Sequence, residues 1–212
     1  MNIAVLDNGI GYIPEIYNAE KYPAHSFTII PALSLEQADL SEYDMFIAPN
    51  GTDHVALFRN REKIQELLDR GGAVLCFCGW TTDWIPGSTW EMQYNIPLRT
   101  YEVTFPDPDH PLLQGVRINE VNISNGKRGF WVCGHINAAP DAEILMVNNL
   151  NEPVMILDER STAGTIVATA SGPLPGSGEE GAGEPHSFDI LFENILQRCE
   201  ARADSTRQVP VS

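Results

Sequence analysis

The sequence has little positive charge. Of its 212 residues, 13 are Lys or Arg and 29 are Asp or Glu, so the formal net charge is -16 at pH 7. Nucleic-acid phosphates and anionic membrane surfaces both attract basic protein surfaces, so this balance predicts no nucleic-acid partner and no membrane partner. We interpret the excess of acid as a solvated surface that keeps the chain in solution.

Long apolar runs are also missing. No stretch approaches the roughly 18 consecutive apolar residues that a membrane-spanning helix needs. The first residues, MNIAVLDNGIG, lack the basic start and the long apolar segment of a secretory signal. These absences predict a cytoplasmic protein.

The cysteines lack the spacing of a zinc site or of a disulfide. Cys76 and Cys78 are two apart in an apolar run, so a strand would place them on the same face, in a poor geometry for a bond. No pair has the two-residue gap typical of zinc ligands. We therefore expect free thiols in a reducing compartment. The four cysteines are Cys76, Cys78, Cys133 and Cys199.

Metal-ligand patterns are absent among the histidines as well. The five histidines are scattered, and none forms a close pair of the kind that binds a transition metal. Asp107, Asp109 and His110 could in principle bind a cation, but Asp-Pro-Asp-His-Pro is also a good turn, which is the interpretation we favour. The sequence thus predicts no metal and no cofactor.

The first half of the sequence alternates between strand and helix patterns. It indicates an α/β fold with a flavodoxin-like, doubly wound, mostly parallel sheet and right-handed crossovers. Ala73 to Cys78 is apolar on both faces and is expected at the centre of the sheet. Strands are expected at 2–6, 25–30, 44–49 and 73–78, and helices near 14–22 and from Asn60 through Leu68.

The second half is richer in strand signals separated by short turns, which predict added β-hairpins. Residues 171–186, with much Gly, Pro, Ser and Glu, are expected to form a flexible loop within a single domain of residues 1–202, and 203–212 a disordered tail. Ser187 is expected to cap a last helix. The expected strands are 98–105, 117–124, 129–133, 142–148, 153–158 and 165–170.

Ligands of doubly wound sheets bind at the carboxyl ends of the strands, near the point where the strand order reverses. This rule selects the loops 7–11 and 50–54 and the segment that starts at Cys78. Trp80, Trp84 and Trp90 in that segment fit either packing of an irregular loop or an aromatic wall for a flat or sugar-like ligand. The candidate ligand-binding residues are Asp7, Asn50, Gly51, His54, Gly79 and Trp80.

Four segments, in order, resemble one family. Residues 43–51, YDMFIAPNG, resemble the strand and turn of class I glutamine amidotransferase-like domains, and 71–79, GGAVLCFCG, the strand that leads to their nucleophile. Residues 110–116, HPLLQGV, resemble a segment common in ThuA-like proteins. Residues 153–158 with 164–170 resemble the closing hairpin of those proteins. Together these pieces span roughly residues 1–200, and the resemblance is closest to ThuA-like proteins.

The resemblance implies roles for particular residues. In the amidotransferases a cysteine on a sharp strand-to-helix turn is the nucleophile, and Cys78 matches its position, while Gly51 matches a source of an oxyanion N–H. The family's His-x-Glu follows the last strand, where this chain has Ala170-Ser171-Gly172. The nearest later histidine is His186, which is the tentative base.

Three functions follow from this pattern. The first is a ThuA-like domain that binds a small polar, carbohydrate-related ligand without the standard catalytic triad. The second is a cysteine-dependent amidohydrolase or amidotransferase that uses Cys78 with His186 or His54 as base. The third is a non-catalytic structural or assembly protein. A homo-oligomer stays open in each case, and whether the chain is an enzyme is left undecided.

Overall fold

The computed structural model describes residues 1–9, 12–77, 79–93, 97, 100–124, 127–128, 133–170, 175 and 185–207. Its centre is a seven-stranded sheet with the strand order β2-β1-β3-β4-β11-β10-β9. The strands are β1 (Asn2–Asp7), β2 (Ser26–Pro31), β3 (Met45–Ala48), β4 (Ala73–Cys76), β9 (Glu143–Val147), β10 (Pro153–Asp158) and β11 (Thr165–Thr169).

The sheet is mostly parallel. Strands β2, β1, β3, β4 and β11 run in one direction, and β10 is antiparallel to both β11 and β9. Every residue of β3, β4 and β11 is buried. These strands carry apolar side chains on both faces of the sheet, as a central parallel strand that is covered on both sides requires. The order 2-1-3-4 and the covered faces confirm the flavodoxin-like α/β fold expected from the sequence.

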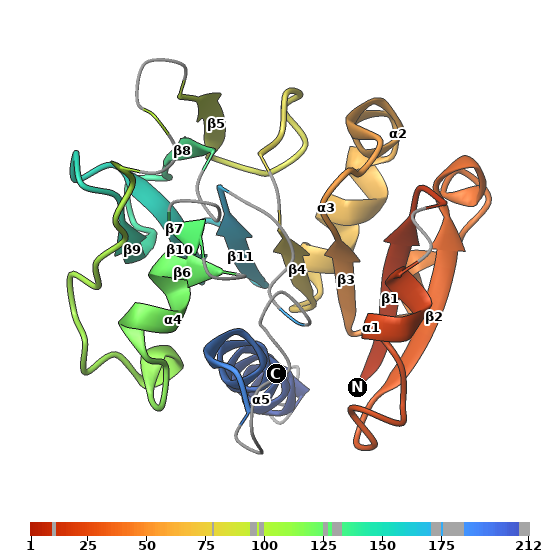
Figure 1. Ribbon diagram of the computed structural model, residues 1–212. Coiled ribbons are helices and arrows are strands. Elements are labelled where there is room, and N and C mark those ends of the chain that lie inside the picture. The colour runs from red at the N-terminus through yellow and green to blue at the C-terminus, as the bar shows by residue number, and fades with distance from the viewer. Residues whose placement is uncertain are drawn as a thin grey trace.

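Helices cover the two faces of the sheet. In Figure 1, α1 (Ile13–Ile16) and α5 (Ser187–Arg207) lie in front of the sheet, and α3 (Arg61–Asp69), which follows α2 (His54–Arg59), lies behind it. An aromatic cluster fastens α5 to its face, with ring centroids 5.1 Å apart for Phe192 and Tyr22 and 6.2 Å apart for Phe192 and Phe77. Such edge-to-face contacts contribute stability beyond the area that the rings bury.

Two small antiparallel ribbons are added in the second half. β5 (Thr89–Met92) pairs with β8 (Gly134–Asn137), and β6 (Ile123–Ser124) pairs with β7 (Lys127–Arg128). The remaining elements are α4 (Ile118–Asn122) and the 3₁₀ turns η1 (Ala32–Ser34), η2 (Leu40–Glu42) and η4 (Pro111–Leu113). No helix among the described residues is long and apolar enough to cross a membrane.

Several element predictions need correction. The strand expected at 117–124 is mostly helix α4, since Ile118 and the buried Val121 are three residues apart and share one helix face. The described residues of 98–105 form no strand, although Thr104 makes an isolated bridge to Val147. The strand expected at 129–133 lies outside the described residues except for Cys133, and helix α2 was not predicted.

Two helix ends also differ from expectation. The helix expected near 14–22 ends at Ile16, because Asn18 donates to the carbonyls of Pro14 and Glu15 and accepts from the amide of Glu20. These local bonds replace helical ones. At the other end of the chain, α5 continues to Arg207, beyond the expected end of the domain at residue 202. Of the loop expected at 171–186, only Pro175, Pro185 and His186 lie within the described residues.

Candidate binding site at the carboxyl ends of the strands

The loops after β1 and β3 are tied together by one side chain. Asn8 donates its amide hydrogen to the carbonyl of Gly51, and its carbonyl oxygen accepts from the amide of Asp53 at 3.2 Å. Gly9 and Gly51 have φ of 82° and 78°, a left-handed conformation that favours glycine. The loops that carry Asp7 and Gly51 therefore meet at the switch point between β1 and β3.

The loop after β3 opens directly into α2. The carboxylate of Asp53 caps this helix by accepting from the amides of Val55 at 2.9 Å and Ala56 at 3.0 Å. His54 is its first residue, and its Nδ1 is buried without a hydrogen-bond partner among the described residues. The carbonyl of His54 accepts from the hydroxyl of Thr82 at 2.9 Å, so the segment after β4 reaches the same edge of the sheet.

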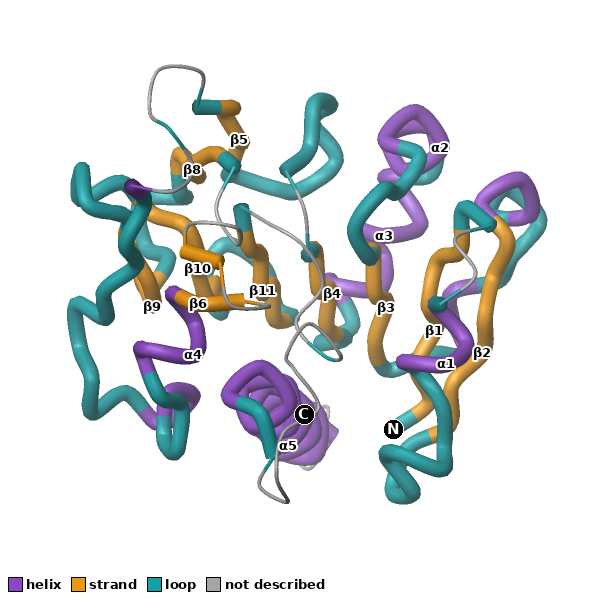
Figure 2. The backbone as a smooth tube through the Cα atoms, viewed as in Figure 1, coloured by secondary structure: helices purple, strands orange, loops and turns teal. Residues whose placement is uncertain are grey.

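The chain after β4 continues without a helix. The amide of Phe77 donates to the carbonyl of Ala48 at 3.0 Å, which extends the β3–β4 ladder by one bond. Cys78 lies outside the described residues. Residues 79–88 are loop and turn up to β5, as the teal trace in Figure 2 shows. A nucleophile elbow is a strand-to-helix turn, and the helix half of that turn is missing here.

The tryptophans of this segment point inward. Trp80 and Trp84 are each 2% exposed, and their indole nitrogens have no hydrogen-bond partner among the described residues. This burial fits the packing interpretation in the conformation seen. Trp90 lies on β5 with its ring against the backbone of Gly79, where a Cβ would overlap the six-membered ring.

The tentative base, His186, caps helix α5. Its Nδ1 accepts from the amide of Phe188 at 3.2 Å, and the two rings lie 5.0 Å apart. The expected cap, Ser187, instead donates its hydroxyl to Glu120 at 2.7 Å. Because Cys78 is not described, the relation of His186 to that thiol stays a prediction.

A second thiol and a second histidine reach this edge, from the residue before β8 and from β8 itself. Cys133 donates its thiol to the carbonyl of Ala170, directly after β11, at 3.1 Å. His135 is 15% exposed in its side chain and lies between Glu91, with Nε2 to Oε2 at 3.7 Å, and Glu152, with Nδ1 to Oε2 at 3.9 Å. Sequence reasoning selected neither Asn8 nor His135, and it did not predict the contact of Trp90 with glycine backbone. The sequence did contain a signal for this contact. Gly79 and Gly134 are isolated glycines, which often mark places where another group packs closely against the backbone.

The Asp-Pro-Asp-His-Pro segment forms the turn that the sequence favoured. The Asp107 carboxylate accepts from the amide of Asp109 at 3.1 Å, and Nδ1 of His110 accepts from the amide of Leu112 at 3.2 Å. Nε2 of His110 lies 3.3 Å from the Glu143 carboxylate. Within the described ranges, no three His, Cys, Asp or Glu side chains are grouped to hold a metal ion.

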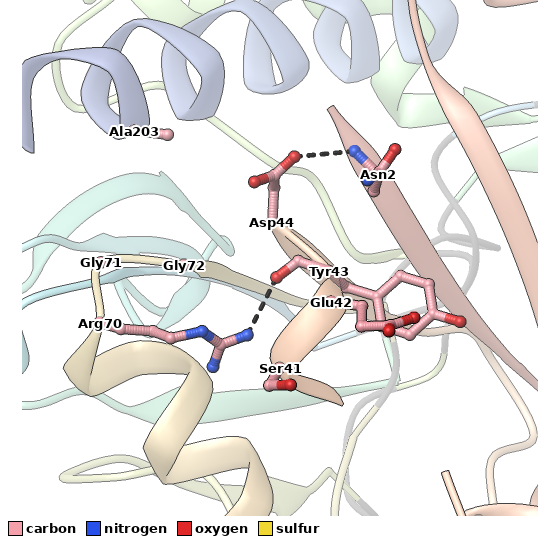
Figure 3. Close-up of a pocket in the computed structure, with 9 residues that line it drawn as sticks. All are labelled: Asn2, Ser41, Glu42, Tyr43, Asp44, Arg70, Gly71, Gly72 and Ala203. Atoms are coloured by element: carbon pink, nitrogen blue, oxygen red, sulfur yellow. Dashed lines mark hydrogen bonds between the residues drawn. The ribbon is translucent and has the colours of Figure 1, made fainter. Parts of the chain in front are cut away.

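A hollow of about 580 Å³ opens at the opposite, amino end of the sheet. As Figure 3 shows, two of its polar side chains bond within the protein: the Asp44 carboxylate accepts from the amide of Asn2 at 2.8 Å, and Arg70 donates to the carbonyl of Tyr43 at 3.1 Å. Ligands of doubly wound sheets bind at the other end. The lining residues are Asn2, Ser41, Glu42, Tyr43, Asp44, Arg70, Gly71, Gly72 and Ala203.

Comparison with known proteins places the fold. No family model and no curated protein sequence matches the chain. A putative GMP synthase subunit from Thermoplasma acidophilum superposes with a TM-score of 0.61 at 13% identity, covering 98% of both chains. A glutamine amidotransferase from Thermotoga maritima superposes with a TM-score of 0.56 at 9% identity, covering 99% of this chain and 86% of that one. At such identities the likeness shows the fold alone, an α/β fold that this chain shares with these two proteins.

Proposed function

We propose that this chain is an amidotransferase-like domain, nearest to ThuA-like proteins, that binds a small polar, carbohydrate-related ligand without the standard catalytic triad. The ligand lies at the carboxyl ends of β1, β3 and β4. The observation that carries the proposal is the Asn8 bridge, which brings the loops after β1 and β3 together beside the segment after β4. Polar loops joined at a switch point are where this architecture binds ligands.

The side chains at this edge suit hydroxyl groups. One oxygen of Asp7 accepts from the amide of Gly9 at 2.8 Å, which orients the carboxylate and leaves lone pairs for a ligand. Asn50 is exposed and offers both a donor and an acceptor. Vicinal hydroxyl groups of a ligand can donate hydrogen bonds to such a carboxylate and accept them from such an amide.

Two features support the proposed lack of a standard triad. β11 ends at Thr169 and is followed by Ala170-Ser171-Gly172, where the family has its histidine and glutamate. Residues 79–88 form no helix, whereas the nucleophile turn of the family leads directly into one. Binding without acyl chemistry is the function that these features support.

The test is thermal unfolding of the full chain in the presence of a panel of mono- and disaccharides, with glutamine as the amidotransferase probe. We expect at least one sugar to raise Tm, because a ligand that binds only the folded state stabilises it. Asp7→Asn should abolish the rise, whereas the exposed control Asp141→Asn should keep it. A panel without any stabilising sugar would contradict the proposal.

The second candidate is a hydrolase that uses Cys78, and His54 favours it. A buried imidazole nitrogen without a partner among the described residues, at the same edge, is available as a base. Ammonia release from glutamine that is lost in both Cys78→Ser and His54→Ala would establish this function in place of the first. If neither sugar binding nor ammonia release is found, the assembly role becomes the better account.

A further inference from the structure

The two edges of the seven-stranded sheet are covered to different degrees. At one edge, β9 is bridged by Thr104, whose amide donates to the carbonyl of Val147 at 2.8 Å and whose carbonyl accepts from the amide of Val147 at 3.0 Å. β2 forms the other edge and, among the described strands, pairs with β1 alone. Figure 1 shows β2 as the outermost strand on its side of the sheet. The outer edge of β2 is therefore a candidate interaction surface.

The pairing with β1 determines which backbone groups of β2 face outward. The amide of Ser26 donates to the carbonyl of Met1 at 3.0 Å, so the backbone of Ser26 bonds toward β1. Alternate residues of a paired strand direct their backbone groups to the same side, so Thr28 also bonds toward β1, while Phe27 and Ile29 face outward. The amides and carbonyls of Phe27 and Ile29 have no hydrogen-bond partner among the described residues.

This edge has few of the features that protect exposed strands. Edge strands usually carry a charged side chain, a bulge or a covering segment that prevents pairing with another chain. β2 reads SFTIIP, without a charged side chain, and its register with β1 runs without a bulge. Pro31 ends the strand and limits outward pairing to Phe27 and Ile29. Leu33, two residues beyond the strand, is 92% exposed, so an open backbone edge lies next to an exposed apolar side chain.

We propose that two copies of this chain associate through antiparallel β2 strands, so that the sheet of one copy continues into the other. In this arrangement Phe27 exchanges two backbone hydrogen bonds with Ile29 of the partner subunit, and Ile29 does the same with Phe27 of the partner subunit. Thr28 lies on the two-fold axis and faces Thr28 of the partner subunit. The edge is thus complementary to itself, as a two-fold interface requires. The inference is independent of the proposed function, since it concerns a strand edge and not the strand ends.

The distribution of charge also favours a second copy in this orientation. The net charge of -16 opposes the approach of two copies, and an uncharged strand is where they repel each other least. Glu20 and Lys21 precede the strand and Glu36 follows it, all three being exposed. Antiparallel pairing places the balanced Glu20–Lys21 end beside Glu36 of the partner subunit. Parallel pairing would instead bring two Glu36 carboxylates together.

Sedimentation velocity of the full chain across a roughly hundredfold range of concentration tests the dimer by mass action. An interface built on a strand of six residues is small, so we expect a weak dimer that dissociates on dilution. Thr28→Lys and Thr28→Glu should each raise the dissociation constant by about fivefold or more, because like charges directly opposite across a strand pair are destabilising. An equal mixture of the two variants should restore association, since lysine then faces glutamate. Thr104→Lys, at the covered edge, is the matched control and should dimerise as the wild type does.

Hydrogen exchange of single amides gives a second measurement on the wild-type chain. The amides of Phe27 and Ile29 should exchange about tenfold more slowly at high protein concentration than at low, whereas the amide of Thr28 should be protected at both. If the Thr28 variants do not fold, as judged by circular dichroism, this comparison decides.

Three results would overturn the proposal. The first is a chain that stays monomeric at every concentration with the Phe27 and Ile29 amides exposed. The second is a dimer that neither charge variant of Thr28 weakens, because another surface then makes the contact. The third is a monomer in which the amides of Phe27 and Ile29 are protected, because another segment of the same chain then covers the edge.

Discussion

Asn8 donates to the carbonyl of Gly51 across 43 residues of sequence, and this contact joins the loops that follow β1 and β3. The same side chain accepts from the amide of Asp53, whose carboxylate caps α2. One amide therefore fixes the switch-point loop, the turn and the start of the next helix relative to one another. The candidate site depends on this arrangement more than on any residue that would itself touch a ligand.

Replacing Asn8 tests that dependence. Asn8→Ala removes two hydrogen bonds at an exposed position, and we expect the free energy of unfolding to fall by about 1 kcal/mol. The measurement is urea unfolding followed by circular dichroism. Asn119→Ala, at an exposed position of α4, is the matched control and should be neutral or slightly stabilising, because alanine favours helix. Equal effects of the two substitutions would show that the Asn8 bridge is not important for stability.

Glu120 predicts an acid-dependent loss of stability. Hydrogen bonds from Arg117, followed by those from Ser187, lower the pKa of Glu120 from 4.5 to about 2. Since the pKa is depressed in the folded state, the stabilisation is complete above pH 4.5 and is lost as pH falls toward 2.

We expect this loss to be about 1 kcal/mol, because the Glu120 side chain is 33% exposed and solvent screens it. The measurement is the free energy of unfolding between pH 2 and pH 6. Glu120→Gln should flatten the curve in this range, while the exposed control Glu36→Gln should leave it unchanged. A wild-type curve that Glu120→Gln does not alter would contradict the assignment.

Glu159 anchors α5 to the turn between β10 and β11. Its side chain is 7% exposed and accepts from Arg198 at 2.5 Å and lies 3.3 Å from Arg202. Glu159→Gln removes the charge that both guanidinium groups face, and we expect a loss of about 2 kcal/mol, since a nearly buried partner is more costly to remove than an exposed one. Thermal unfolding measures it, with Glu36→Gln as the exposed control. If the loss of stability is no greater than that of the control, solvent already stabilises the charges of the two arginines without the Glu159 carboxylate.

The parallel half of the fold could be predicted because its strands are apolar on both faces. The runs MFIA in β3 and AVLC in β4 are wholly buried, and only the centre of a covered sheet buries both faces. The second half was harder, since short segments such as RINEVN contain few apolar residues and fit either period. Val121 packs inward because Arg117 and Ser187 fix α4 against α5, a contact across 70 residues that no local pattern encodes.

The candidate site, like the fold, could be predicted from the sequence only in part. The strand-end rule placed Asp7, Gly51 and His54 at one edge, since it needs only the order of the strands. Trp90 was grouped with Trp80 and Trp84 by proximity in sequence, although it lies on a different element and meets Gly134, which is 44 positions later. The pairing of β5 with β8 decides which of the three nearby tryptophans contacts the backbone of the residue after Cys78. The sequence did not predict that pairing.

Gly79 and Trp90 provide a direct test of this packing through a double-mutant cycle. Gly79→Ala places a methyl group into the indole ring, and we expect a loss of about 2 kcal/mol, typical of overpacking. Trp90→Ala removes the ring, so adding Gly79→Ala to it should cost much less. The coupling free energy between the two sites should therefore exceed about 1 kcal/mol. Urea unfolding of the four proteins measures it.

Gly9→Ala is the control for that cycle. Gly9 also follows a strand end and has φ of 82°, but no atom of the described residues lies within 4 Å of the position of its Cβ. The substitution should cost about 1 kcal/mol through backbone strain alone and should add independently to Trp90→Ala. If Gly79→Ala is as costly without Trp90 as with it, the glycine is required for its backbone conformation and the ring is not packed against it in solution. A coupling confined to Gly79 would instead place Trp90 at the end of β4, as the structure does.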